Sequence, residues 1–382
     1  MRQDGIHAML PYDQCEPHVQ KQRDFYARKP GAPFIQREFG YYCLDRWYSE
    51  GLDKDADLAE VFGYDQSATA ALRGLGWCEA GFEPEFETVV LEDRGEYELE
   101  QDFAGRGVLY FKGRRNGFMP EYVTHPVRDE KSFMEKCAWR MDPNTPERQA
   151  KMDIYLPEMV AKAKRGYHVA QGIVGGYMYL RALIGPGELL TMFYDDPKLV
   201  HLCMRAWYEL ADSVIARHQQ ALTIDEVFIG EDICYNHGPL ISPDMMKEFL
   251  FPYYQQLLDG VKRRNIDQSR HVYFQVDTDG NCRPVIDLYK TLGMDYMSPF
   301  EVASGCDVVA IGQQYPELIM SGGVDKRVLA LGPRAIDEMV DRVFPAMRAR
   351  GGYTPTSDHG VPEEVSLENY IHYRKRCKEF SV

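Results

Sequence analysis

The stretch His271 to Gly280, HVYFQVDTDG, decides how the rest of the chain is interpreted. Its first half is a short apolar run of strand-forming residues around Phe274, which predicts a buried β-strand. The run ends at Asp277 in a turn cluster, and a helical pattern with Pro284 in its first turn follows. The carboxylates of Asp277 and Asp279 therefore lie where a strand gives way to a helix. In an α/β barrel, catalytic residues collect at this end of the strands.

The same order of short strand, acidic end and helical pattern recurs through the C-terminal half. Apolar strands are expected near residues 227–230, 296–300, 318–323 and 353–357. The acids that follow them are Glu231 with Asp232, Glu301, Asp325, and Asp358 next to His359. Because the acids at 277, 301, 325 and 358 are about one βα unit apart, the series of acid-tipped strands predicts one acidic rim. With a first strand expected at Phe34–Phe39, the pattern predicts the α/β class and a (β/α)8 TIM-like barrel.

A second period appears in residues 84–113. Three runs with strand-like alternation, at 88–93, 96–100 and 107–112, are separated by glycine-containing turns, which predicts an antiparallel meander. The segment is too small to hold its own core, so we expect an insertion in one barrel domain spanning residues 1–382. The following stretch, Pro120 to Pro126, is interpreted as a linker.

Composition limits the classes of function. The chain has 382 residues, 45% of them hydrophobic, and a formal net charge of −15, which disfavours nucleic acid or an anionic membrane as partner. Nine scattered cysteines without a Cys-x-x-Cys pair indicate neither a disulfide framework nor a structural zinc finger. The sequence shows no signal-peptide apolar region and no membrane-length apolar run, so a cytoplasmic protein is expected. Whether it forms a homo-oligomer stays open.

Several motifs together resemble the uroporphyrinogen decarboxylase superfamily. The strongest is Gly238 to Pro243, GPLISP, continuing to FLFPY at residues 249–253. Support comes from Asp195-Asp196-Pro197, DTDGN at 277–281, GGVDKR at 322–327 and Gly351-Gly352-Tyr353 before Asp358-His359. The resemblance covers roughly residues 20–380. It implies a distorted (β/α)8 barrel with its site at the C-terminal ends of the strands, which agrees with the pattern of acids.

The superfamily contains two main chemistries, decarboxylation of uroporphyrinogen and methyl transfer to or from a corrinoid. The positions at which this chain departs from the family motifs help to choose between them. The decarboxylases grip substrate carboxylates with two arginines in an opening motif, but this chain opens MRQDGIH, with Ile6 at the second arginine position. The thiol-directed methyltransferases carry a His-x-Cys zinc site where this chain has Gln275-Val276-Asp277. The chain looks most like the branch that demethylates methoxylated compounds and passes the methyl group to a corrinoid protein. Zinc is the metal that this branch implies.

The resemblance and the rim together give a set of candidate residues. Clustered carboxylates with a histidine can hold zinc as a Lewis acid, or one carboxyl kept neutral by its neighbours can protonate a leaving oxygen. The same residues also have ordinary roles as helix caps, ion pairs and core aromatics. The candidates are Glu231, Asp277 and Asp279 as catalytic residues, Glu301 and His359 as metal ligands, and Tyr177, Tyr353 and Arg181 as substrate-binding residues.

The predicted function is methyl transfer from a methoxylated or methylated small molecule to a corrinoid protein. Two alternatives stay open. One is decarboxylation of uroporphyrinogen or a similar tetrapyrrole, which needs arginines converging on the mouth of the barrel. The other is a corrinoid- or tetrapyrrole-binding protein without turnover, which would tolerate loss of the rim acids without losing affinity.

Overall fold

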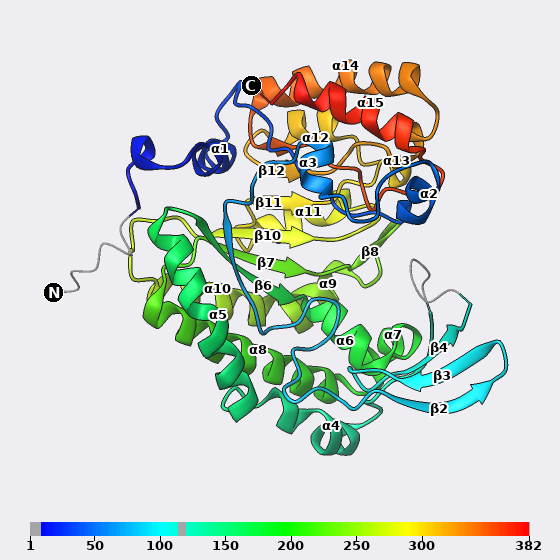
Figure 1. The fold of residues 1–382 in the computed structure, drawn as a ribbon. Coiled ribbons are helices and arrows are strands. Elements are labelled where there is room, and N and C mark those ends of the chain that lie inside the picture. The colour runs from blue at the N-terminus through cyan, green and yellow to red at the C-terminus, as the bar shows by residue number, and fades with distance from the viewer. Residues whose placement is uncertain (1–8, 114–119, 382) are drawn as a thin grey trace.

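A curled parallel sheet is the frame of the molecule. In a computed structural model that describes residues 9–113 and 120–381, seven parallel strands form a half-barrel in the order β1-β6-β7-β10-β11-β12-β13 (Figure 1). The α/β class and the TIM-like fold are thereby confirmed. The strands are β1 (Thr69–Leu72), β6 (His168–Val174), β7 (Glu226–Gly230), β10 (Tyr273–Asp277), β11 (Tyr296–Ser298), β12 (Ile319–Ser321) and β13 (Tyr353–Thr354).

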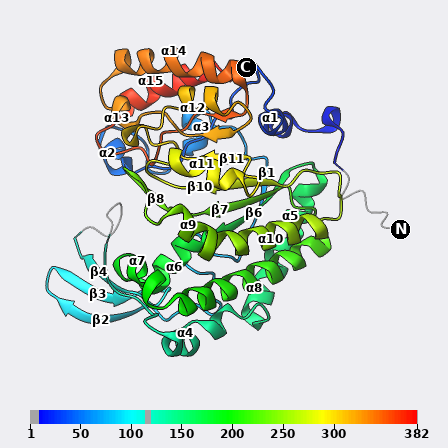
Figure 2. The same cartoon turned by 180° about the vertical axis from the view of Figure 1, so that it is seen from behind.

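Helices flank the sheet on two opposite sides (Figure 1). Figures 1 and 2 show, from opposite sides, that α12, α14 and α15 lie beyond β12, whereas α5, α8 and α10 lie beyond β6. The α-helices are α1 (Pro17–Tyr26), α2 (Leu44–Ser49), α3 (Leu58–Phe62), α4 (Glu130–Lys136), α5 (Pro146–Lys164), α6 (Gly176–Ile184), α7 (Pro186–Asp195), α8 (Pro197–Ala221), α9 (Pro243–Met245), α10 (Phe251–Arg264), α11 (Arg283–Lys290), α12 (Val308–Gln314), α13 (Lys326–Leu329), α14 (Pro333–Arg350) and α15 (Leu367–Lys378). A π-helical turn, Met246–Leu250, joins α9 to α10, and a two-stranded hairpin pairs β8 (Cys234–Tyr235) with β9 (Gly238–Pro239).

The unit β10–α11 shows why the predicted strands and helices form. Phe274 and Val276 alternate with polar residues along β10, and both are fully buried. α11 has Pro284 in its first turn, and its buried residues include Val285, Ile286 and Tyr289. The apolar side chains that alternate along β10 and those on one face of α11 thus belong to the same buried core, and this burial stabilises the unit.

The first predicted strand, Phe34–Phe39, is wrong. The segment is extended but pairs with no neighbouring strand in the described chain, so the parallel sheet has seven strands. Its backbone is satisfied elsewhere: the Phe34 N–H donates to the Phe380 carbonyl, and the Gln36 N–H donates to the Asp65 carboxylate. Because these partners lie in loops and at the C-terminus, the sheet does not close, and the edge at β1 stays free of a second strand.

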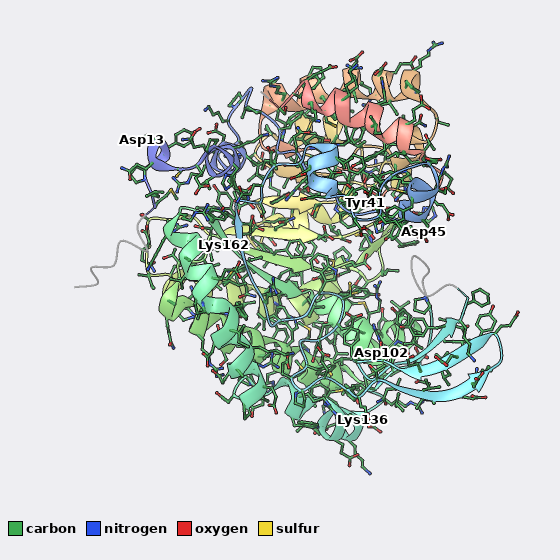
Figure 3. The ribbon with its side chains drawn as sticks, in the orientation of Figure 1. Asp13, Tyr41, Asp45, Asp102, Lys136 and Lys162 are labelled. Atoms are coloured by element: carbon green, nitrogen blue, oxygen red, sulfur yellow. The ribbon has the colours of Figure 1, made fainter. Side chains whose placement is uncertain are left out.

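The predicted insertion is a four-stranded antiparallel sheet. Its strands are β2 (Val89–Arg94), β3 (Tyr97–Gln101), β4 (Gly107–Phe111) and β5 (Glu121–Thr124). The first three match the predicted meander, but β5 lies in the stretch interpreted as a linker, so that interpretation is wrong. Asp102, labelled in Figure 3, lies at the base of the sheet and makes an ion pair of 2.7 Å with Arg106. Every residue of β2 is exposed, whereas Gly107 and Val108 at the start of β4 are buried.

Among the described residues, no helix has the length and apolarity needed to cross a membrane.

Candidate functional site

The site is built where the parallel strands end. In β7 and β10, side chains alternate between the inner face of the half-barrel and the helix layer outside it. Phe228 of β7 is the register partner of Gln275, and Gly230 is the partner of Asp277, so these residues share one face. Phe228 lines a cavity of about 620 Å³, which identifies this shared face as the inner one.

Asp277 lies at the inner end of β10 and is partly buried. The Ser298 hydroxyl, on the adjacent strand β11, donates to its Oδ2 at 2.6 Å. Burial raises the pKa of Asp277 to about 7, helped by the negative charges of Asp279 and Asp232, while the Ser298 hydrogen bond and His359 act in the opposite direction. Near neutral pH, this carboxyl therefore exists in both charged and neutral forms, as a general acid requires.

Glu231 faces the other way. It follows Gly230, so it turns out of the inner face and is fully buried between the sheet and the helices. The Tyr254 hydroxyl of α10 donates to Oε2 at 2.5 Å, and the Tyr177 backbone N–H at the start of α6 donates to Oε1 at 3.2 Å. Burial raises the pKa of Glu231 to about 7 despite these donors. This carboxyl braces the N-terminus of α6 and does not face the cavity.

Asp279 and His359 form a pair on the rim. His359 Nε2 lies 3.4 Å from Asp279 Oδ2, and the hydrogen bond to Asp279 raises the pKa of His359. The imidazole also packs against Phe39 and stacks on Tyr42, with ring centroids 5.1 and 5.8 Å away. The two predicted residues are thus brought together, and the histidine is held in its charged form over a wider pH range.

Glu301 carries two donors already. Lys326 Nζ lies 3.0 Å from Oε1, and the Gly280 N–H donates to Oε2 at 2.8 Å. A cation bound here would have to displace the ammonium group of Lys326. Within residues 9–113 and 120–381, no three histidine, cysteine, aspartate or glutamate side chains are arranged to hold a metal ion. Glu301 and His359, as arranged, do not fit a zinc ion.

The three predicted substrate-binding residues lie in different surroundings. Arg181 of α6 makes an ion pair of 2.7 Å with Asp232, whose backbone has φ 43°, an uncommon value for a residue with a side chain. Tyr177 is buried at the start of α6. Tyr353 lies in the core, where its hydroxyl donates to the Gly322 carbonyl at 2.7 Å. Only Arg181 is partly exposed at the rim.

The cavity brings in residues that the sequence did not identify. Trp77 and Phe228 stack in parallel, with centroids 5.2 Å apart and an interplanar angle of 3°. Much of the remaining lining is small or aromatic, including Ala71, Phe82, Phe103, Ala170 and Gly172. The charged lining residues are Arg73, Glu79, Glu83, Glu85 and Glu226. Trp77 lies in a loop without a periodic pattern, so no sequence signal pointed to it. Ser298 could have been predicted as a rim residue, because it lies in the apolar run 296–300 that leads to the rim acid Glu301.

Three basic side chains at the rim are paired with acids, whereas Arg283 donates to the Asn281 side-chain oxygen. Besides Arg181 with Asp232 and Lys326 with Glu301, Arg327 makes an ion pair of 2.8 Å with Asp325. Asp325 and Arg327 therefore form an ion pair within the rim. These paired cations leave the rim without a convergent set of free arginines for a polyanion.

Comparisons with known proteins agree with this architecture. A solved structure, the methyltransferase from Methanosarcina mazei, superposes with a TM-score of 0.57 at 14% identity and covers 96% of this chain and 99% of its own, which shows a shared fold. Uroporphyrinogen decarboxylases from Hydrogenovibrio crunogenus and Alcanivorax borkumensis are each 26% identical, over 198 and 199 residues. These matches cover 51% and 48% of this chain and 52% and 49% of the relatives. The chain thus matches about half the length of these curated relatives.

The family comparison covers the part of the chain that carries the rim. The sequence model described as Uroporphyrinogen decarboxylase (URO-D) matches residues 124–380, which include every strand of the parallel sheet except β1. With the half-barrel and the acids at its strand ends, this match establishes that the chain belongs to the uroporphyrinogen decarboxylase (URO-D) family.

Proposed function

We propose that the protein is a methyltransferase that moves a methyl group from a methoxylated or methylated small molecule to a corrinoid carried by a partner protein. The observation that carries the proposal is Asp277, a carboxyl on the inner face with a pKa raised to about 7. The fold shared with the Methanosarcina mazei methyltransferase is consistent with it.

Asp277 can act as the general acid of this reaction. When an ether donor reacts, the O–CH₃ bond breaks and the oxygen takes the proton from Asp277, because an ether oxygen leaves poorly without a proton. When bound, the reduced corrinoid supplies the nucleophile that accepts the methyl group. The charged His359 beside Asp279 adds positive charge near the developing oxyanion. No step is assigned to zinc.

The charges at the rim disfavour the decarboxylase alternative. Uroporphyrinogen carries many carboxylates, and binding it needs free cations at the mouth. Arg181, Lys326 and Arg327 each have a carboxylate partner within 3.0 Å. A polyanion would have to break these ion pairs, whereas a neutral methoxylated or methylated compound leaves them intact.

The test is an assay with free cob(I)alamin and a panel of methoxylated aromatic compounds and methylated amines, with methylcobalamin formation followed by absorbance. Uroporphyrinogen decarboxylation is measured in parallel. We expect methyl transfer by the wild type, a loss of roughly a hundredfold or more in Asp277→Asn, and near-normal rates in the control Asp325→Asn. Asp325 is a rim acid of the same type, but it caps α13 and pairs with Arg327.

Two results would overturn the proposal. Decarboxylation of uroporphyrinogen without methyl transfer would assign the chain to the other chemistry of the family. Cobalamin binding that is equal in wild type and Asp277→Asn, with no turnover of any donor, would favour a binding protein without catalysis.

A further inference from the structure

A short hydrogen-bond chain crosses between β10 and β11 beneath the rim. Gln275 Nε2 lies 2.9 Å from Ser298 Oγ, and Ser298 Oγ lies 2.6 Å from Asp277 Oδ2. Ser298 is the register partner of Asp277, while Gln275 precedes Asp277 by two residues on the same face. Gln275 and Ser298 are 7% and 6% exposed, so water competes little with these bonds.

The donor and acceptor in each of these two hydrogen bonds follow from the number of protons that each side chain carries. A serine hydroxyl has a single proton to donate. Because the Gln275 amide donates to Ser298, the hydroxyl oxygen acts as acceptor on that side and directs its own proton to Asp277. Oδ2 of Asp277 therefore always accepts a hydrogen bond, in both charge states of the carboxyl.

The two oxygens of Asp277 are consequently not equivalent. Among the hydrogen bonds of residues 9–113 and 120–381, Oδ2 has a donor and Oδ1 has none. The hydroxyl oxygen of a neutral carboxyl is a weaker acceptor than its carbonyl oxygen, so the Ser298 donor is best accommodated when Oδ2 is the carbonyl oxygen. The neutral carboxyl thus carries its proton on Oδ1.

We infer that Ser298 and Gln275 are positioning residues that fix the proton of Asp277 on Oδ1, the oxygen that protonates the leaving group. The inference deepens the proposed function and rests on it for the catalytic part. The structural part, that Ser298 donates to Asp277, stands independently of the reaction. The surrounding charges are the acids Asp279 and Asp232 and the cation His359, which all four variants below retain.

The experiment follows the Asp277 carboxyl directly, by ¹³C labelling of aspartate and a pH titration whose signal is assigned with Asp277→Asn. The variants are Ser298→Ala, which removes the donor, and Gln275→Met, which removes the group that orients it. Ser321→Ala is the matched control, because Ser321 ends β12 as Ser298 ends β11 and both are 6% exposed. The pH dependence of kcat and KM for methyl transfer is measured on the same proteins.

We expect Ser298→Ala to raise the pKa of Asp277 by about one unit, because the charged form loses its donor. Gln275→Met should cause a smaller rise, and Ser321→Ala none. In methyl transfer, Ser298→Ala should lower kcat about tenfold with KM little changed, and the pH profile should move with the titration. A purely structural role would leave the pH profile where it is.

The outcomes separate the inference from the proposed function. An unchanged titration in Ser298→Ala, or an equal shift in Ser321→Ala, overturns the inference whether or not methyl transfer occurs. If the titration shifts as expected but the protein transfers no methyl group from any donor, the hydrogen bonds from Gln275 to Ser298 and from Ser298 to Asp277 are supported. The catalytic role of Asp277 is then overturned.

Discussion

Two carboxyls that lie on adjacent strand ends show how differently one chemical group can be used. Glu231 and Asp277 are both enclosed at the end of the parallel sheet, and burial raises the pKa of each to about 7. Glu231 faces the helices and accepts hydrogen bonds from Tyr254 and the Tyr177 N–H. Asp277 faces the cavity side and has a single donor, Ser298.

The comparison teaches that a perturbed pKa does not identify the catalytic group by itself. Burial raises the pKa of the bracing carboxyl, Glu231, to about the same value as that of Asp277, the proposed general acid. The direction in which the side chain points decides which of the two can meet a substrate. Variants of the two residues should therefore separate activity from stability.

The largest expected difference is in activity. Asp277→Asn should lose about 10² to 10⁴ in kcat, the usual contribution of a general acid. Glu231→Gln retains the shape and should change kcat by less than about tenfold, because Glu231 does not face the cavity. Both rates are measured in the cob(I)alamin assay on variants with wild-type circular dichroism. Equal losses in the two variants would contradict the distinction.

The pH dependence of stability should be alike for the two carboxyls. Each has a folded pKa raised to about 7, above that of the unfolded chain, so its neutral form is favoured in the folded state. The wild type therefore loses stability from this source as the pH rises from about 4 to 7. Relative to wild type, Asp277→Asn and Glu231→Gln should each gain about 3 kcal/mol between pH 5 and 8. Urea unfolding at both pH values measures this, and a flat difference would refute it.

Adding a methyl group should lower stability on the helix-facing side of the sheet but not on its inner face. A Cβ at Gly175 would lie 2.3 Å from Glu231 Oε2 and 2.7 Å from the Gly230 carbonyl, so Gly175→Ala should cost about 2 kcal/mol. Gly172→Ala is the matched control on β6, since a Cβ there meets nothing within 4 Å. Thermal unfolding of the pair gives the comparison. Similar midpoints for both variants would mean that Gly175 is not tightly packed.

The smallest expected effect comes from removing one donor of Glu231. Tyr254→Phe leaves the buried carboxyl with fewer partners and should lower the free energy of unfolding by about 1 to 2 kcal/mol. Tyr253→Phe removes a hydroxyl that is bonded to His201 in a more exposed setting and should cost less. Denaturant titration resolves the two. A larger loss for Tyr253→Phe would reverse the assignment of Tyr254 as a brace.

The sequence predicted the fold in the half where strands, acids and helices repeat. From Val227 to Asp358, each of the predicted strands formed, since apolar alternation determines which residues can be buried together. The segment Phe34–Phe39 was also predicted as a strand but takes its backbone partners from Asp65 and Phe380, far along the chain. Local pattern does not reveal such distant partners.

The site could be predicted by position but only partly by orientation. The rim acids were identified, and Asp279 with His359 proved to be neighbours. The alternation from Val227 to Glu231 already places Glu231 on the face of the buried Val227 and Ile229, so its outward direction could have been inferred. The pairing of Glu301 with Lys326 and the place of Trp77 depend on loop geometry, which has no period to follow.

The unclosed edge of the sheet has a kinetic consequence. Where β1 has no further neighbour, the inner face remains open to the flank, and the side chain of Ala71 is exposed there. A small reactant can approach Phe228 along this seam while a bulky second reactant approaches the strand ends. If the protein transfers a methyl group as proposed, neither route obstructs the other, and we expect random-order addition with intersecting double-reciprocal plots for the two reactants.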